Sequence, residues 1–277
     1  MRIALVGQPN CGKSALFNSV AGYKTIVSNF PGTTVDFVAS QVHLNGDRFT
    51  LIDLPGIYSL STSEREEILA RRYLIEEKPD LVINILDASV LSRSLELTLE
   101  LLELKLPLVI CLNMIDEAAK KGVEIDVAHL SQDIGVPVIP AIANRGQGVP
   151  ELFQTAVEKA KSGITGKIHF LSLDVERIIS ELADLLGAAT AARLGVPARF
   201  LAIRLLEEDE EFVQAVREIT PGILSDVQRL RGVLSECHGR PSDMVMSSER
   251  HSLAMNLFDH VAKVKQRSAK PFREHTD

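Results

Sequence analysis

Several short segments carry residues whose types and spacing could bind a nucleotide through its phosphates. The stretch Gly7–Ser14 reads GQPNCGKS and lies between an apolar strand pattern and a helix pattern. In a GxxxxGKS loop of this kind, backbone N–H groups surround the phosphates, the lysine reaches the β and γ oxygens, and the serine hydroxyl binds Mg²⁺. The helix that begins at Lys13 adds its positive end. We therefore expect a P-loop here.

Two further segments predict the metal and γ-phosphate contacts. Thr34 follows Thr33 and directly precedes the next strand pattern, so its hydroxyl is expected to complete the magnesium shell from a loop ordered by the γ-phosphate. Asp53 ends an apolar strand, and Gly56 follows in the sequence Asp-Leu-Pro-Gly. Its carboxylate suits Mg²⁺ through a bound water, and the Gly56 N–H suits the γ-phosphate.

The last two segments predict a guanine reader. Asn113 and Asp116 follow a buried strand pattern. The Asp116 carboxylate can accept hydrogen bonds from N1–H and the 2-amino group of guanine, and adenine would leave this acceptor unpaired. Ala143 and Asn144 follow the last strand, where a backbone N–H can meet guanine O6; this is the weakest of the five segments.

Together these segments predict a site for GTP or GDP with Mg²⁺. The expected catalytic residues are Asn10, Lys13, Thr34 and Gly56. The expected metal ligands are Ser14, Thr34 and Asp53 for Mg²⁺ and Asn10 for K⁺. The expected nucleotide-binding residues are Gly7, Gln8, Pro9, Asn10, Cys11, Gly12, Lys13, Ser14, Ala15, Gly32, Thr33, Thr34, Val35, Asp36, Asp53, Leu54, Pro55, Gly56, Asn113, Met114, Ile115, Asp116, Ile142, Ala143 and Asn144.

Hydrolysis needs a group other than the glutamine that orients water in Ras-like proteins, because Ile57 and Tyr58 follow Gly56 here. Asn10 is the candidate, since its carboxamide oxygen could hold a monovalent cation beside the β and γ phosphates. The alternative is a loop asparagine that only forms hydrogen bonds. We therefore expect a slow GTPase that K⁺ stimulates.

Composition narrows the class of protein. The chain has 277 residues, a net charge of −7 and 45% hydrophobic residues, so it can bury a core, and the acidic balance argues against nucleic acid as the main partner. Its three cysteines form no CxxC pair, and Cys111 lies in an apolar run, which favours a reducing cytosol. No signal peptide or membrane-length apolar stretch is visible, so this segment is expected to be soluble.

The apolar patterns predict two domains. Residues 1–165 alternate strands and helices, which indicates a Ras-like α/β domain with a mostly parallel six-stranded sheet, one antiparallel edge strand and helices on both faces. Residues 166–277 read as a small all-α domain. Its expected helices are Val175–Leu186, Ala198–Glu207, Phe212–Ile219, Leu224–Cys237 and Ser247–Lys265.

The sequence resembles the cytoplasmic N-terminal part of the ferrous iron transport protein B family. The resemblance rests on Gly7–Ser14, on Ser28–Val35, on Asp53–Leu60 and on Asn113–Asp116. It implies a GTPase domain followed by a helical domain that stabilises bound GDP, K⁺-stimulated hydrolysis with Asn10 as ligand, and a membrane region that moves iron(II). The expected location is the cytoplasmic face of a bacterial inner membrane.

The resemblance also implies partners and some departures. The partners are the membrane region that would follow this fragment, small Feo accessory proteins and a second copy in a homo-oligomer, with no nucleic acid. Ser28 stands where a glycine is usual, Phe30 where tryptophan is commoner, and Ile142 where a serine usually precedes Ala143. Ile142 is expected to loosen the base pocket.

Two other function classes stay open. A free cytosolic GTPase of the Era or TrmE type, acting in ribosome assembly or tRNA modification, would share the P-loop, and a pure GTP-binding module would lack useful turnover. The histidines, including His251 and His260, show no metal-ligand spacing and are expected to be exposed. Glu64, Glu66 and Glu67 are expected to form a solvated acidic surface, with Glu66 or Glu67 as a contact to the helical domain.

Overall fold

The computed structural model describes residues 1–21, 25–29, 36–44, 46–61 and 65–265 of the chain. Its first part is a seven-stranded sheet in the order β2-β3-β4-β1-β5-β6-β8. β1 pairs in parallel with β4 and β5, whereas β3 is antiparallel to both β2 and β4. The strands are β1 Arg2–Gly7, β2 Thr25–Asn29, β3 Asp36–Leu44, β4 Asp47–Asp53, β5 Leu81–Asp87, β6 Leu108–Asn113 and β8 Val138–Pro140.

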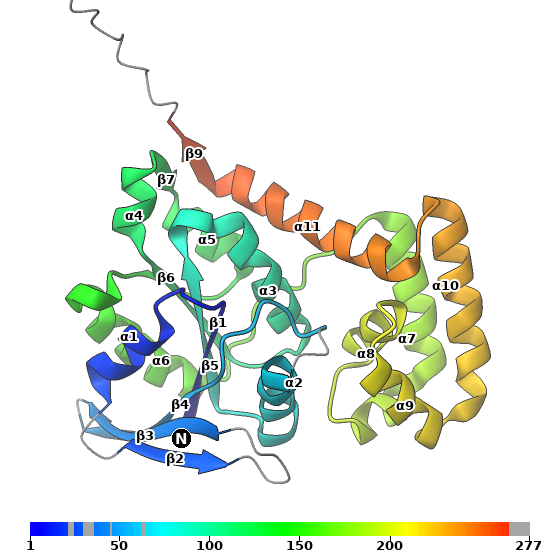
Figure 1. Ribbon diagram of the computed structural model, residues 1–277, viewed down its shortest axis with the longest axis horizontal. Helices are drawn as coiled ribbons and strands as arrows, with labels where there is room; N and C mark the ends of the chain where they lie inside the picture. The colour runs from blue at the N-terminus through cyan, green and yellow to red at the C-terminus, as the bar shows by residue number, and fades with distance from the viewer. Residues whose placement is uncertain (22–24, 30–35, 45, 62–64, 266–277) are drawn as a thin grey trace, which may run out of the picture.

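Helices cover both faces of this sheet (Figure 1). Because successive side chains of a strand point to opposite faces, Ile3 and Leu5 of β1 pack with α1 and α6, and Ala4 and Val6 pack on the side of α2, α3 and α5. The helices are α1 Lys13–Val20, α2 Arg65–Arg72, α3 Leu91–Glu103, α4 Ile115–Lys120, α5 Val127–Ile134 and α6 Val149–Ser162. Shorter turns are η1 Tyr73–Glu77, a π-helix, and the 3₁₀ turns η2 Ala88–Val90 and η3 Ala143–Arg145.

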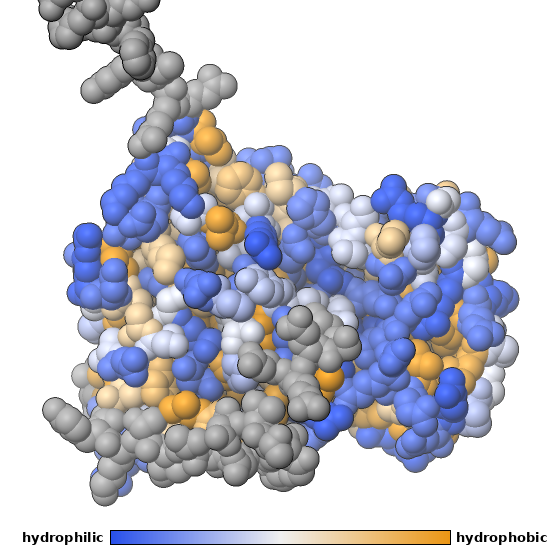
Figure 2. All heavy atoms as spheres, in the orientation of Figure 1, coloured by the Kyte–Doolittle hydropathy of each residue, from blue (hydrophilic) through white to orange (hydrophobic). Residues whose placement is uncertain are grey.

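The second part is helical, as the sequence predicts. It contains α7 Leu173–Arg193, α8 Ala198–Leu206, α9 Glu210–Ile219, η4 Pro221–Ile223, α10 Leu224–His238 and α11 Ser242–Val261. One buried cluster continues from Leu86 and Leu95 of the first part into Leu201 and Leu234 of the second. Hydrophilic side chains predominate on the visible face of the helical part (Figure 2).

The predicted fold class is confirmed, with differences in detail. β2 is an additional strand on the antiparallel edge, so the sheet has seven strands rather than six. The helix predicted over Ser247–Lys265 begins earlier, at Ser242, and ends at Val261. The residues that follow, Ala262–Val264, form β9 and pair with β7 (Val123–Ile125), because Ala262 adopts an extended conformation that ends the helix.

Among the described residues, no single helix has the length and apolar character that crossing a membrane requires. α7 and α8 meet that test only when taken as a pair, and they are bent by 111° where one ends and the other begins.

Candidate nucleotide site

A pocket of about 420 Å³ lies between the end of β1 and the start of α1. It joins residues of the first and third predicted segments. Its lining comprises Gln8, Pro9, Asn10, Gly12, Lys13, Ser14, Ala15 and Gly56. Because the first N–H groups of a helix have no partner within the helix, the start of α1 presents donors and positive potential here. The pocket therefore has the shape and polarity of an anion site.

The loop backbone is left-handed at two positions. Asn10 has φ +67° and Gly12 has φ +93°. A Cβ on Gly12 would lie 2.2 Å from Nδ2 of Asn113, so glycine is required there both by its backbone conformation and by space. Asparagine is among the few other residues that adopt this conformation readily, and its side chain is exposed at the pocket.

Lys13 forms an ion pair with Asp53, in which Nζ lies 2.6 Å from Oδ1. Each side chain retains little exposure, 12% for Lys13 and 13% for Asp53. β4, which Asp53 ends, is the parallel neighbour of β1, so the sheet brings this carboxylate to the P-loop. The lysine is therefore held at the pocket by a carboxylate that suits a divalent cation.

The segment after Asp53 is fixed by its backbone. The Ile57 N–H donates to the Gly7 carbonyl at 3.1 Å, and Gly56 packs on Pro9 so closely that a Cβ would lie 3.1 Å from the Pro9 backbone. Ile57 is fully buried. The guanidinium carbon of Arg93 lies over the Tyr58 ring, 4.7 Å from the ring centroid. Neither side chain is placed to orient water at the pocket.

Asn113 links the P-loop to the segment around Ala143. Its Nδ2 donates to the Cys11 carbonyl at 2.8 Å, and its Oδ1 accepts from the Ala143 N–H at 2.9 Å. Asn113 is 2% exposed, so both polar groups of its amide are used inside the protein. The structure thus gives Asn113 a positioning role, whereas Asp116 stays available to a ligand.

Asp116 lies in the first turn of α4, after Met114 in the left-handed conformation with φ +60°. Its Oδ2 lies 3.5 Å from an Nη of Arg145, and Asn144 beside this arginine is exposed. Ile142 is buried and exchanges backbone hydrogen bonds with Gln147. β6 and β8 are neighbours in the sheet, which brings the fourth and fifth segments together at one edge.

Cys11 contributes its backbone rather than its thiol. Burial raises the pKa of the Cys11 thiol to about 11, and a Cβ on Gly7 would lie 2.7 Å from its sulfur. Cys111 is also fully buried, as the apolar run predicts, and burial raises its pKa. Both behave as small core residues.

The structure therefore brings together the first, third, fourth and fifth predicted segments. Leu54 is buried and its N–H donates to the Leu5 carbonyl, so it positions the segment without facing the pocket. The second segment, Gly32, Thr33, Thr34 and Val35, lies outside the described residues, as does Phe30; Ser28 and Asp36 are described as parts of strands β2 and β3.

Glu67 corrects one expectation. Its side chain is 5% exposed rather than solvated, and it accepts a hydrogen bond from the Tyr58 N–H at 2.6 Å, within the first part of the chain. No sequence pattern pairs a helical glutamate with a backbone group nine positions earlier, so this contact could not be found from spacing. His251 and His260 are exposed, as expected.

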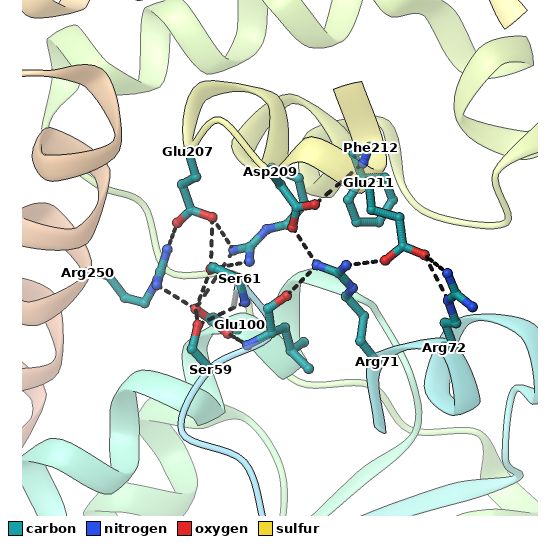
Figure 3. Close-up of polar contacts among 12 residues, drawn as sticks. Ser59, Ser61, Arg71, Arg72, Glu100, Glu207, Asp209, Glu211, Phe212 and Arg250 are labelled. Atoms are coloured by element: carbon teal, nitrogen blue, oxygen red, sulfur yellow. Dashed lines mark hydrogen bonds and ion pairs between the residues drawn. The ribbon is translucent and has the colours of Figure 1, made fainter. Parts of the chain in front are cut away.

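A buried ionic network joins the same segment to the helical part (Figure 3). Glu100 of α3 accepts from the Ser59 hydroxyl at 2.8 Å and from the Leu60 N–H, and it pairs with Arg250 of α11 at 2.5 Å. Burial raises the pKa of the Glu100 carboxyl, but Arg250, Arg204 and the Leu60 N–H outweigh it, so the net pKa is lowered. Glu100 is therefore a carboxylate that both parts share.

Arg71 of α2 forms the second half of the network. It pairs with Asp209 and Glu211 at the start of α9 and donates to the Leu60 carbonyl at 2.9 Å. Burial acts to raise the pKa of Glu211, yet the hydrogen bond from Arg72 and the charge of Arg71 lower it overall. The residues that follow Gly56 thus contact the helical part directly through Ser61, whose hydroxyl donates to Glu207 at 3.0 Å, and indirectly through the partners of Leu60.

The described residues contain no group of three or more His, Cys, Asp or Glu side chains that could hold a metal ion. The P-loop pocket, the adjoining polar strand ends and the doubly covered sheet define a P-loop nucleotide-binding domain of the G-domain class, followed by a helical domain.

Comparisons with known proteins agree with this class. The family model described as ferrous iron transport protein B matches residues 1–156, and that of the FeoB cytosolic helical domain matches residues 172–263. The chain belongs to the ferrous iron transport protein B family. It is 40% identical over 228 residues to an Fe(2+) transport protein A/Fe(2+) transporter FeoB fusion protein of Porphyromonas gingivalis, which covers 80% of this chain and 27% of the relative.

A second relative, the Fe(2+) transporter FeoB of Salmonella typhimurium, is 38% identical over 215 residues, or 76% of this chain and 27% of that protein. The chain thus spans about a quarter of the length of these relatives. Among solved structures, a GDP-bound mutant of S. thermophilus NFeoB matches with a TM-score of 0.85 and 32% identity, covering 95% of this chain and 100% of that one. The cytosolic domain of L. pneumophila FeoB matches with a TM-score of 0.80 and 30% identity, over 95% and 100% of the two chains.

Proposed function

We propose that this chain binds GTP and GDP with Mg²⁺, hydrolyses GTP, and serves as the cytoplasmic regulatory part of a bacterial ferrous iron transporter at the inner membrane. The observation that carries the proposal is the convergence of Lys13, Ser14 and Gly56 on one pocket, where Lys13 pairs with Asp53. Asp116 lies beside Arg145 at the neighbouring strand ends. The relatives named as Fe(2+) transporters supply the transport context. The alternative of a free GTPase in ribosome or tRNA metabolism is not favoured, since the helical domain also matches this family.

The residues have separate tasks in this proposal. Lys13 and the N–H groups at the start of α1 bind the β and γ phosphates, and Asp116 accepts from the guanine edge. Asn113 positions both loops through Cys11 and Ala143. Ser14, Thr34 and, through water, Asp53 would hold Mg²⁺, which neutralises phosphate charge when bound. Their oxygen donors fit a hard cation.

Asn10 is the proposed ligand for K⁺. Its left-handed backbone turns the loop at the pocket, its side chain is exposed there, and an amide oxygen is a suitable donor for a monovalent cation. Because Ile57 is buried, no side chain directly after Gly56 supplies the function of the Ras glutamine. A cation beside the β and γ phosphates would instead offset charge that develops during hydrolysis.

The partners proposed are the membrane region of the longer protein and small Feo accessory proteins. The fusion of transport protein A with FeoB in the P. gingivalis relative supports the second of these.

The test is phosphate release from GTP in matched KCl and NaCl. Wild-type protein is expected to turn over about tenfold faster in K⁺, which corresponds to about 1.4 kcal/mol of barrier. Asn10→Ala should remove this difference while retaining GDP binding by calorimetry, and Lys13→Ala should lose nucleotide binding. Equal wild-type rates in both salts would end the K⁺ proposal, and tight ATP binding without GDP binding would end the proposal of a guanine-nucleotide site.

A further inference from the structure

The C-terminal end of the described chain returns to the nucleotide-binding domain. α11 runs from the helical domain back across the first domain, and β9 follows it beside β7 (Figure 1). The antiparallel register pairs Val123 with Val264, Glu124 with Lys263 and Ile125 with Ala262. Two further hydrogen bonds close its ends, from the Lys265 N–H to the Gly122 carbonyl at 2.8 Å and from the Asp126 N–H to the Val261 carbonyl at 2.7 Å.

Along the chain, β7 follows closely after the helix that carries Asp116. α4 spans Ile115–Lys120, and β7 begins three positions after its end. Within the described part of the chain, β9 is the strand that pairs with β7, which is not part of the large sheet. The intervening Gly122 has φ +79°, and a Cβ on it would lie 2.9 Å from the Lys265 carbonyl oxygen. The return strand is therefore packed against the connection between α4 and β7.

α4 depends on its surroundings for its position. A helix of six residues is too short to be stable by itself in water. At its N-terminal end α4 is fixed by β6 and by Met114, whose backbone is left-handed. At the C-terminal end of α4, Lys121 contacts Ser89 of η2, with Nζ 3.0 Å from Oγ. The backbone then enters β7, which pairs with β9.

We propose that β9 is a positioning element for guanine recognition: by pairing with β7 it holds α4 so that the Asp116 carboxylate faces the N1–H and 2-amino edge of the base. This inference rests on the proposed function and adds a specificity-determining role for residues 262–265. Asp116 remains the group that contacts the base, and β9 acts through it.

The pairing of β9 with β7 is weak enough to be reversible. A two-stranded ladder of three residues is marginal in water by itself. The ion pair between Lys265 and Glu124 has side chains exposed by 68% and 58%, so it adds little. Anything that displaces β9 would therefore remove one of the two contacts that hold the C-terminal end of α4, the other being Lys121 with Ser89, and guanine would be held less selectively.

A matched pair of substitutions at Lys263 isolates the backbone contribution. Hydrogen-bonded pairs alternate along an antiparallel ladder, so the bonds at Gly122–Lys265 and Asp126–Val261 place Glu124–Lys263 at a hydrogen-bonded position. Lys263→Pro removes its N–H donor, whereas Lys263→Ala keeps it. Ala262 already has φ −114° and ψ 138°, which a following proline accepts, so the change does not force the preceding residue.

The readout is the ratio of the Kd values for IDP and GDP, measured by calorimetry on the full chain. IDP lacks the 2-amino group, so this ratio reports the contact with Asp116 and is insensitive to the phosphates. Wild type is expected to prefer GDP by about 10- to 100-fold, the range for a hydrogen bond to a charged group. Lys263→Pro should lower this preference by about three- to tenfold and speed GDP release, and Lys263→Ala should change neither by more than about twofold.

The outcomes separate the inference from the proposed function. An unchanged preference in Lys263→Pro, with wild type selective for GDP, would overturn the inference alone. A loss of affinity shared equally by GDP and IDP would also overturn it, because it would indicate a general loosening of the pocket. Wild type that fails to bind GDP would overturn both. The ratio refers to the folded fraction, and a thermal melt of each variant confirms that this fraction is large.

Discussion

Lys13, which lines the nucleotide pocket, and Asp53 neutralise one another, with 2.6 Å between Nζ and Oδ1. A phosphate that binds Lys13 must compete with this carboxylate, and a magnesium ion that approaches Asp53 must compete with the lysine. When phosphate and metal bind together, each charge exchanges one partner for another, and neither is left unpaired. An unpaired charge would be costly for side chains as little exposed as these. The pair therefore favours joint binding of nucleotide and metal over binding of either one alone.

Asp53→Asn tests this exchange. The amide keeps the side-chain shape but frees Lys13, so GDP affinity without Mg²⁺ should stay the same or rise. The gain in GTP affinity on adding Mg²⁺ should fall about tenfold, or by about 1.4 kcal/mol. Calorimetry with and without Mg²⁺ measures both. Asp47→Asn is the matched control, since Asp47 at the other end of β4 pairs with Lys161 at the surface, where the exposed side chains should make the change silent.

Asn113→Ala and Asp116→Ala should differ in their effects on stability. The first leaves the buried Cys11 carbonyl and Ala143 N–H without their partner, at a cost of about 1–3 kcal/mol for each group. The nucleotide-free protein should therefore melt several degrees lower, and GDP affinity should fall with it. Asp116→Ala should lose GDP affinity with little change in melting temperature. Equal melting temperatures for both variants without nucleotide would contradict the positioning role of Asn113.

These predictions also show what the sequence could reveal. Lys13, Ser14, Asp53 and Asp116 can be proposed from local spacing because each stands at a strand or helix end that the sequence marks. The Glu100 and Arg71 networks cannot be, since Arg71 and Asp209 are 138 positions apart and no local pattern pairs them. β9 was missed because Ala262–Val264 continues the apolar spacing of the preceding helix, and β2 was missed because a five-residue edge strand gives little pattern. The predicted boundary between domains at residues 165 and 166 stays a prediction, as do the ligand-binding roles of the site residues, Gly32–Val35 included.

Arg71→Ala should destabilise the whole chain. Arg71 is 3% exposed and its partner Asp209 is 4% exposed, so the substitution leaves a buried carboxylate without its cation. Breaking a buried pair in this way costs about 3–5 kcal/mol. Arg72→Ala is the adjacent control, because Arg72 is 43% exposed and pairs with the same Glu211, and it should cost at most about 1 kcal/mol. Chemical denaturation of both variants gives the free energies of unfolding; similar values would argue against the buried pair as a link between the domains.

Thiol chemistry should separate the cysteines. Cys237 is exposed and should react with a maleimide at pH 8, whereas Cys11 and Cys111 should react only after unfolding. The pKa of Cys11 is raised from 9.0 to about 11, so its thiolate fraction at pH 8 is about 100-fold lower than that of an unperturbed thiol. Because burial favours the neutral thiol, the contribution of Cys11 to the free energy of unfolding is complete below pH 9. This contribution is lost as the pH rises from 9 toward 11. Mass spectrometry of labelled peptides at pH 8 and pH 10 checks the order of reactivity.

The continuous core has a mechanical consequence. Because one apolar cluster runs from Leu86 of strand β5 to Leu201 and Leu234 in the helical part, neither part can rotate as an independent body without exposing that interior to water. Signals between them must then travel as small repacking displacements of side chains already in contact. Heating should accordingly melt both parts in a single calorimetric transition rather than in two steps.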